Sequence, residues 1–196
     1  MKTSITILLT FIFSTLFCQT RFDTVDFNKV NFKLLNGLLI EKTNSERMKV
    51  SVPTYSEHEV CQLSAEYQSG YMAFYNRVCH ENDFEFKGEK LVKIRDRIEF
   101  FSKKTKKGMS PSYEVCLMRE YLTYQKITYE KLSFDLINQF MQSEPHRICL
   151  LSNTISKSKD YLSFATNVRK KGEDRIKFYV TGVSGFFEVI NFFMSQ

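Results

Sequence analysis

A long helical repeat in the second quarter of the chain limits most strongly what this sequence can fold into. Over residues 57–78 apolar side chains recur at every third or fourth position, the spacing of one face of an α-helix: they are Val60, Leu63, Tyr67, Tyr71, Phe74 and Val78. Ser56 with Glu59 resembles a capping box at the start. We therefore expect a helix here that delivers Cys79 and His80 at its end.

Helical spacing recurs in other segments. It predicts a first helix over about residues 24–43, a shorter one over about 91–101 and another over about 129–142. Ser143 can cap a further turn, in which Pro145 is tolerated because the first N–H groups of a helix have no partner.

The spacing elsewhere is that of strands. Residues 112–118 form a short apolar run, and residues 161–168, 175–183 and 186–193 alternate or run apolar. The Lys-Lys-Gly-Glu-Asp at 170–174 is typical of a hairpin turn. Helices followed by antiparallel strands predict an α+β layered domain.

The N-terminal segment predicts export. One Lys2 precedes an apolar run from Ile5 to Phe17, so residues 1–19 are expected to be a signal peptide, since the run is shorter than the roughly 20 residues that span a bilayer. A membrane anchor and a lipid-modified Cys18 are the alternatives, and Phe17 is unusual before a lipidated cysteine. The mature protein is thus expected to be secreted or periplasmic, without a transmembrane segment.

Size and charge narrow the class further. The chain of 196 residues, with 43% hydrophobic residues and few glycines and prolines, suits a single domain over 24–196. Losing the leader removes Lys2 and no acid, so the formal charge falls from +6 to +5. The basic residues are spread over several loops and interrupted by acids, whereas a nucleic-acid face gathers them with aromatics. No nucleic-acid partner is expected.

The exported part keeps four cysteines: Cys61, Cys79, Cys116 and Cys149. An even number in an oxidising compartment predicts disulfides, with three pairings possible. Cys61 and Cys79 lie about 27 Å apart on one predicted helix, at a rise of 1.5 Å per residue, which is too far for a bridge.

Residues of about 28–185 resemble the CAP superfamily, the cysteine-rich secretory, antigen-five and pathogenesis-related proteins with their bacterial SCP-like relatives. AEYQSGYMAFYNRVCHEN at 65–82 resembles the family's second helix and its terminal histidine, and INQFMQSEPHRICLL at 137–151 resembles its Trp-x-x-Ser-Pro-Gly-His-Arg motif. RIKFYVTGVSGF at 175–186 resembles its closing strand. The resemblance implies an α-β-α sandwich with a central cleft.

In that family two histidines and up to two glutamates line the cleft and bind a divalent metal in several members. The resemblance assigns the histidines to His80 and His146 and one glutamate to Glu114, while the second glutamate has no match. Two imidazoles and one carboxylate would suit zinc with an open position for water. The sequence departs from the motifs at Phe140, in place of tryptophan, and at Cys149, in place of asparagine.

The same resemblance places three cysteines around the cleft. It pairs Cys79 with Cys116 or Cys149 and leaves Cys61 for the remaining one.

A hydrolase built on Cys149 and His146 is disfavoured, because nothing supplies an oxyanion hole or an orienting acid.

The resemblance therefore implies a secreted protein that binds rather than catalyses. Its cleft, lined by His80, Glu114 and His146, would take a small ligand, a lipid-like molecule or a protein partner, with or without a divalent metal. No catalytic residue is assigned. The alternative is a metal-dependent hydrolase that activates water at the same three residues.

Overall fold

The computed structural model describes residues 19–83, 85–86, 88–152 and 160–187. The predicted leader, apart from Gln19, lies outside the described residues, and so does most of the strand predicted over 186–193. No helix in the described part of the chain combines the length and apolar character needed to cross a bilayer.

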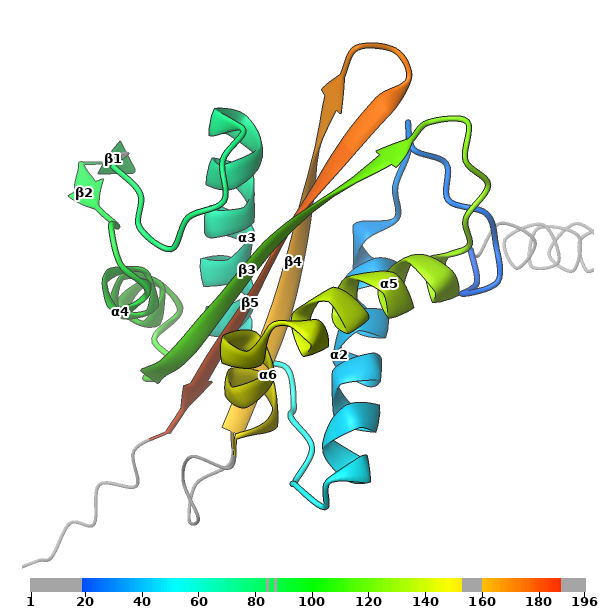
Figure 1. Ribbon diagram of the computed structural model, residues 1–196. Coiled ribbons are helices and arrows are strands. Elements are labelled where there is room, and N and C mark those ends of the chain that lie inside the picture. The colour runs from blue at the N-terminus through cyan, green and yellow to red at the C-terminus, as the bar shows by residue number, and fades with distance from the viewer. Residues whose placement is uncertain (1–18, 84, 87, 153–159, 188–196) are drawn as a thin grey trace, which may run out of the picture.

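The architecture is a three-layer α-β-α sandwich (Figure 1). An antiparallel sheet runs in the order β3-β5-β4, so β3 and β4 are its edge strands. One face carries α2, α5 and α6, and the other carries α3, α4 and a small hairpin of β1 and β2. The helices are α2 (Phe32–Lys49), α3 (Glu59–Tyr75), α4 (Ile94–Thr105), α5 (Tyr129–Gln142) and α6 (Glu144–Leu151). The strands are β1 (Glu85–Phe86), β2 (Glu89–Lys90), β3 (Ser110–Leu122), β4 (Asp160–Lys171) and β5 (Arg175–Phe186). The predicted α+β class and layering are confirmed.

Alternation along the strands builds a separate core on each face. Leu117, Leu162 and Phe178 point to the side of α2 and α5, while Ala165 and Val183 point to the side of α3 and α4. Because successive side chains of a strand face opposite ways, each strand serves both cores.

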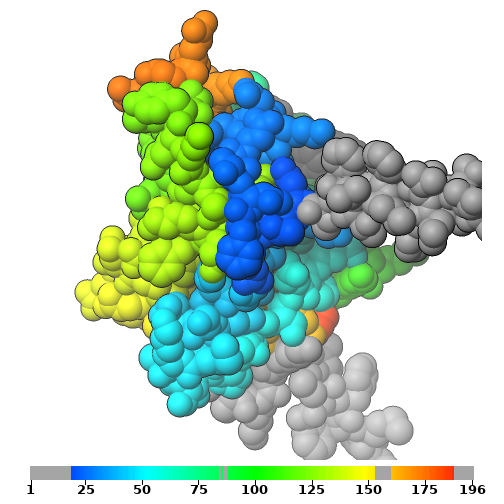
Figure 2. All heavy atoms as spheres, turned by 90° about the vertical axis from the view of Figure 1, so that its right-hand side faces the viewer, coloured from blue at the N-terminus to red at the C-terminus, as the bar shows by residue number. Residues whose placement is uncertain are grey.

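The first helix begins later than predicted. It starts at Phe32, where Asn31 accepts a hydrogen bond from the N–H of Leu34, and not near residue 24. The preceding residues form turns instead, and the Val25 N–H is bonded to the carbonyl of Ile127. Figure 2 shows this N-terminal segment, in blue, lying along the junction of α2 and α5.

Helix α3 is shorter than the predicted 57–78, and its caps explain why. His58 is the N-cap, and its Nδ1 accepts from the Val60 N–H at 3.2 Å. This ring also packs against Tyr161, and His58 is half-buried. Asn76 ends the helix with a left-handed φ of 55°, and its side chain accepts from the Tyr179 hydroxyl at 2.6 Å. The chain therefore turns toward β3 before residue 79.

Candidate functional site

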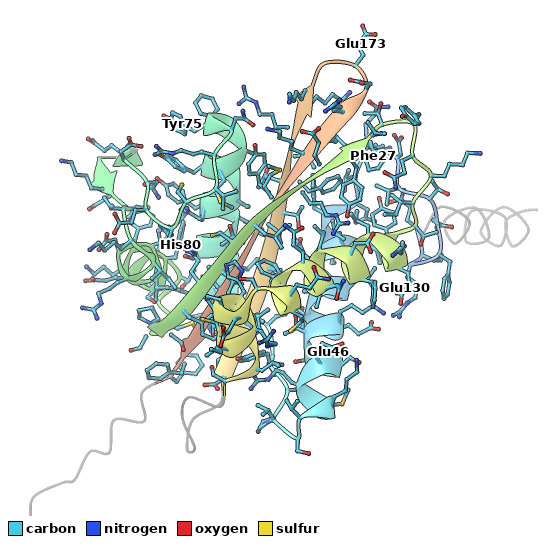
Figure 3. The ribbon with its side chains drawn as sticks, viewed as in Figure 1. Phe27, Glu46, Tyr75, His80, Glu130 and Glu173 are labelled. Atoms are coloured by element: carbon cyan, nitrogen blue, oxygen red, sulfur yellow. The ribbon has the colours of Figure 1, made fainter. Side chains whose placement is uncertain are left out.

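A buried amide network positions the segment that follows α3. Gln68, on the inner face of α3, donates to the carbonyl of Cys79 at 2.6 Å. The amide of buried Asn82 donates to Gln68 at 3.2 Å and to the carbonyl of Leu91 at 2.9 Å. These hydrogen bonds hold both ends of the segment 79–82. The His80 side chain between them lies on the side of the sheet that carries α3 and α4 (Figure 3).

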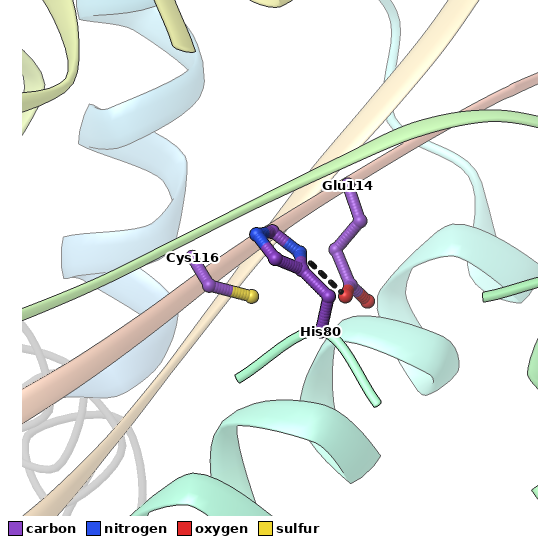
Figure 4. A group of neighbouring side chains, drawn as sticks. All are labelled: His80, Glu114 and Cys116. Carbon is purple, nitrogen blue, oxygen red and sulfur yellow. Dashed lines mark hydrogen bonds and ion pairs between the residues drawn. The ribbon is translucent and has the colours of Figure 1, made fainter. Parts of the chain in front are cut away.

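His80 meets Glu114 of β3. The Nδ1 of His80 lies 3.2 Å from Oε1 of Glu114 (Figure 4). The Glu114 side chain is 3% exposed, whereas that of His80 is 56% exposed. The hydrogen bond with Glu114 raises the pKa of His80 more than its partial burial lowers it. The site therefore contains an imidazole that is open to solvent and hydrogen-bonded to a buried carboxylate.

The second oxygen of Glu114 is bonded to Arg97 of α4. The guanidinium Nη2 donates to Oε2 of Glu114, and Nη1 donates to the carbonyl of Val92 at 3.0 Å. Arg97 is completely buried. A buried carboxylate is stable only with a charge partner, so Arg97 is what allows Glu114 to sit at this depth.

His146 approaches from the other helical layer. It lies on α6, half-buried, with its ring edge-on to Phe140 at a centroid distance of 5.3 Å. Helix α6 is anchored by buried Arg47, whose guanidinium donates to the carbonyl of Leu150 at 2.7 Å. Burial lowers the pKa of His146, and the charge of nearby His80 lowers it further. The two predicted histidines thus lie in different helical layers and interact through their charges.

A metal at the predicted residues meets obstacles. The ligand atoms of His80, Glu114 and Cys116 lie within 4.8 Å of one another, and His146 is not in that group. Arg97 already neutralises Glu114, so a divalent cation there would face a guanidinium. Burial raises the pKa of the Cys116 thiol well above its usual range, whereas zinc needs the thiolate. This donor set fits a metal poorly, and zinc at His80, Glu114 and His146 stays a prediction.

The four cysteines predicted to form disulfides are all free thiols in the structure. Cys61 lies in the core between α3 and α4, while Cys149 packs against the core of the opposite face, so the sheet separates one of the two pairs that the prediction left open for Cys61. Cys79 packs against the cluster that contains Cys116, also without a bond. Burial raises the pKa of Cys61 to about 12 and the pKa values of Cys79 and Cys149 to a smaller extent.

The residues that support the site were missed from the sequence, although a signal existed. Arg97 stands one helical turn from Ile94 and Phe101, which places it on the buried face of α4. Gln68 likewise shares the inner face of α3 with Met72. A charged or amide side chain at a core position implies a buried partner, and that partner can be sought on the facing strand.

The chain matches no protein-family profile and no curated protein sequence. Among solved structures it is similar to an outer surface protein from Borrelia burgdorferi, with a TM-score of 0.46 and 12% identity over 82% of this chain and 96% of that one. It is also similar to an extracellular protein containing an SCP domain from Bacillus anthracis str. Ames, with a TM-score of 0.45 and 16% identity over 78% of this chain. The match covers 40% of the Bacillus anthracis protein, less than half its length. Likenesses at this level do not assign the chain to a family.

Proposed function

We propose that this chain is an exported, CAP-like binding protein that carries out no reaction of its own. The observation that carries the proposal is the exposed imidazole of His80, fixed by the buried pair of Glu114 and Arg97. A side chain whose position is fixed by buried hydrogen bonds is preorganised to bind a ligand. The sequence motifs around His80 and His146 support the same assignment.

Glu114 and the thiols of the site are poorly suited to catalysis. Both oxygens of Glu114 are engaged, one by His80 and one by Arg97, so this carboxylate is a poor general base. The thiols of Cys79 and Cys116 are weak nucleophiles, because burial raises the pKa of both. Binding therefore accounts for the geometry better than hydrolysis does.

The ligand we propose is a small or lipid-like molecule with an acidic head group. His80 keeps its proton more readily than an ordinary histidine, and more than half of its side chain is open to solvent. Helix α6, in the opposite helical layer, offers apolar surface at Ile148, which is 60% exposed. A carboxylate could pair with the imidazolium while an alkyl chain lies over α6.

Histidine NMR tests this directly, because the chain has three histidines and each reports on a different place. Decanoate should shift the imidazole signals of His80 and His146 and leave those of His58 unchanged, whereas decanol, which lacks the carboxylate, should shift neither strongly. Unchanged decanoate affinity in both His80→Ala and His146→Ala would show that the ligand binds elsewhere.

The rival function is a zinc-dependent hydrolase, which the proximity of the His80, Glu114 and Cys116 ligand atoms favours. Zinc would have to share Glu114 with Arg97, which is bonded to Oε2 of that carboxylate. Metal analysis of the purified protein, followed by titration with zinc at micromolar concentration, separates the two functions. Zinc that binds in wild type and is lost in His80→Ala would favour the hydrolase.

A further inference from the structure

Helix α3 carries a group of four aromatic residues that the His80 site does not use. Tyr67, Tyr71, Phe74 and Tyr75, here called the aromatic cage, line a cavity of about 220 Å³. Phe74 is 71% exposed and Tyr75 is 44% exposed. Figure 3 shows Tyr75 at the C-terminal end of α3. Large aromatic side chains exposed together on a helix are costly in water unless something covers them.

The rings stand at angles to one another, as the walls of a cage do. The Tyr71 and Tyr75 rings lie 4.6 Å apart between centroids with an interplanar angle of 44°, and Phe74 and Tyr75 lie 4.9 Å apart at 78°. Steps of three and four residues put these side chains on one stripe of the helix. The stripe therefore presents several ring faces and edges to one small volume.

A cation already lies over two of these rings. The guanidinium carbon of Arg77 is 5.3 Å from the centroid of Tyr71 and 5.9 Å from that of Tyr75. Asp83, which accepts a hydrogen bond from the Tyr71 hydroxyl, pairs with Arg77 at 3.0 Å, so the two charges offset each other. Ring faces attract cations because of their quadrupole. The rings of the cage thus hold a cation of the protein itself, and a cationic ligand would take the place of Arg77 over them.

We propose that the aromatic cage binds a trimethylammonium group, such as that of choline. The lining residues offer ring surfaces and carry no carboxylate or amide, so a primary ammonium would lose hydration without gaining matching acceptors. A quaternary ammonium has no N–H to satisfy and is bound by aromatic cages through charge and contact. This site is separate from the one proposed at His80, and neither proposal depends on the other.

Titration with tetramethylammonium and phosphocholine tests the cage. The chain has no tryptophan, so tyrosine fluorescence or aromatic NMR signals report binding without interference. Phe74→Ala and Tyr75→Ala, both at exposed positions, should each weaken binding about three- to tenfold. Phe134→Ala is the matched control: Phe134 is 51% exposed on α5 and lies beneath Lys131, but belongs to no cage.

Two further binding measurements identify which molecule carries the trimethylammonium group. Vesicles of phosphatidylcholine that bind the protein, and release it when phosphocholine is added, identify a lipid head group. Binding of free phosphocholine without vesicle binding identifies a soluble choline compound. Equal affinity for phosphoethanolamine, or equal binding by wild type and Phe74→Ala, would overturn the proposal, as would the absence of binding at millimolar concentration.

Discussion

Replacing Arg97 with methionine removes the cation on which the His80 site is built. The Arg97 side chain is 0% exposed and that of Glu114 is 3% exposed, so the substitution leaves a buried carboxylate without its charge partner. It also removes the donor to the carbonyl of Val92, which lies at 3.0 Å. Breaking one partner of a buried ion pair costs about 3–5 kcal/mol. The folded state survives such a loss if the domain has the usual stability of about 5–15 kcal/mol.

Urea unfolding followed by circular dichroism measures this loss. With an m-value of about 2 kcal/mol per M, the midpoint should fall by about 1.5–2.5 M. Arg95→Met is the control, because Arg95 is exposed on the same helix and should change the stability by less than about 0.5 kcal/mol. The double variant Arg97→Met/Glu114→Leu should recover much of the loss, since no buried charge remains. A loss in Arg97→Met as small as that in Arg95→Met would refute the role given to the ion pair.

Two further predictions concern pH and packing. The pKa of His80 is raised in the folded state, so its bond to Glu114 stabilises fully below the unfolded pKa of about 6.5 and is lost as the pH rises through the folded pKa. The melting temperature of wild type should therefore fall relative to that of His80→Gln between about pH 6 and pH 9, and a constant difference would count against the bond. Gly182→Ala would place a Cβ 2.6 Å from Cε1 of buried Phe164, so it should lower the free energy of unfolding by about 1–3 kcal/mol, as measured by thermal unfolding. Gly37→Ala is the matched control, because Gly37 lies on the exposed face of α2 and a Cβ there meets nothing within 4 Å. It should raise the free energy of unfolding by about 0.5–1 kcal/mol. A neutral Gly182→Ala would mean that the sheet tolerates a shift there.

Periodicity in the sequence was enough to predict an α+β layered domain, whereas the α-β-α sandwich was implied by the family resemblance. Residues 129–142 are helical as predicted, and the turn at 170–174 joins β4 to β5, with Gly172 at a φ of 71°. The start of α2 was wrong because Phe27 happens to keep helical spacing with the residues that follow. Its ring packs against Phe178 of the sheet from a turn, and periodicity cannot distinguish such tertiary packing from a helix face.

The site was only partly accessible from the sequence. The family resemblance drew attention to His80 and Glu114, and these two residues are in contact. It could not indicate Arg97, because a buried arginine is explained by a partner 17 positions away that only the packing of α4 on β3 brings near. Nor could composition show that the thiols stay apart, since distances across a sheet depend on which face each cysteine occupies.

The charges of the two histidines are coupled although they belong to different helical layers. His80 contacts Glu114 of the edge strand β3, and its charge acts on His146 of α6. Their pKa values move in opposite directions, raised for His80 and lowered for His146, so between the two pKa values one ring is charged and the other neutral. A pair in that state offers one charged donor beside a neutral ring, which matches a ligand with a single negative charge better than one with two. Affinity for decanoate should therefore be highest below the pKa of His80 and fall as the pH rises through it, and an affinity independent of pH would separate the ligand from His80.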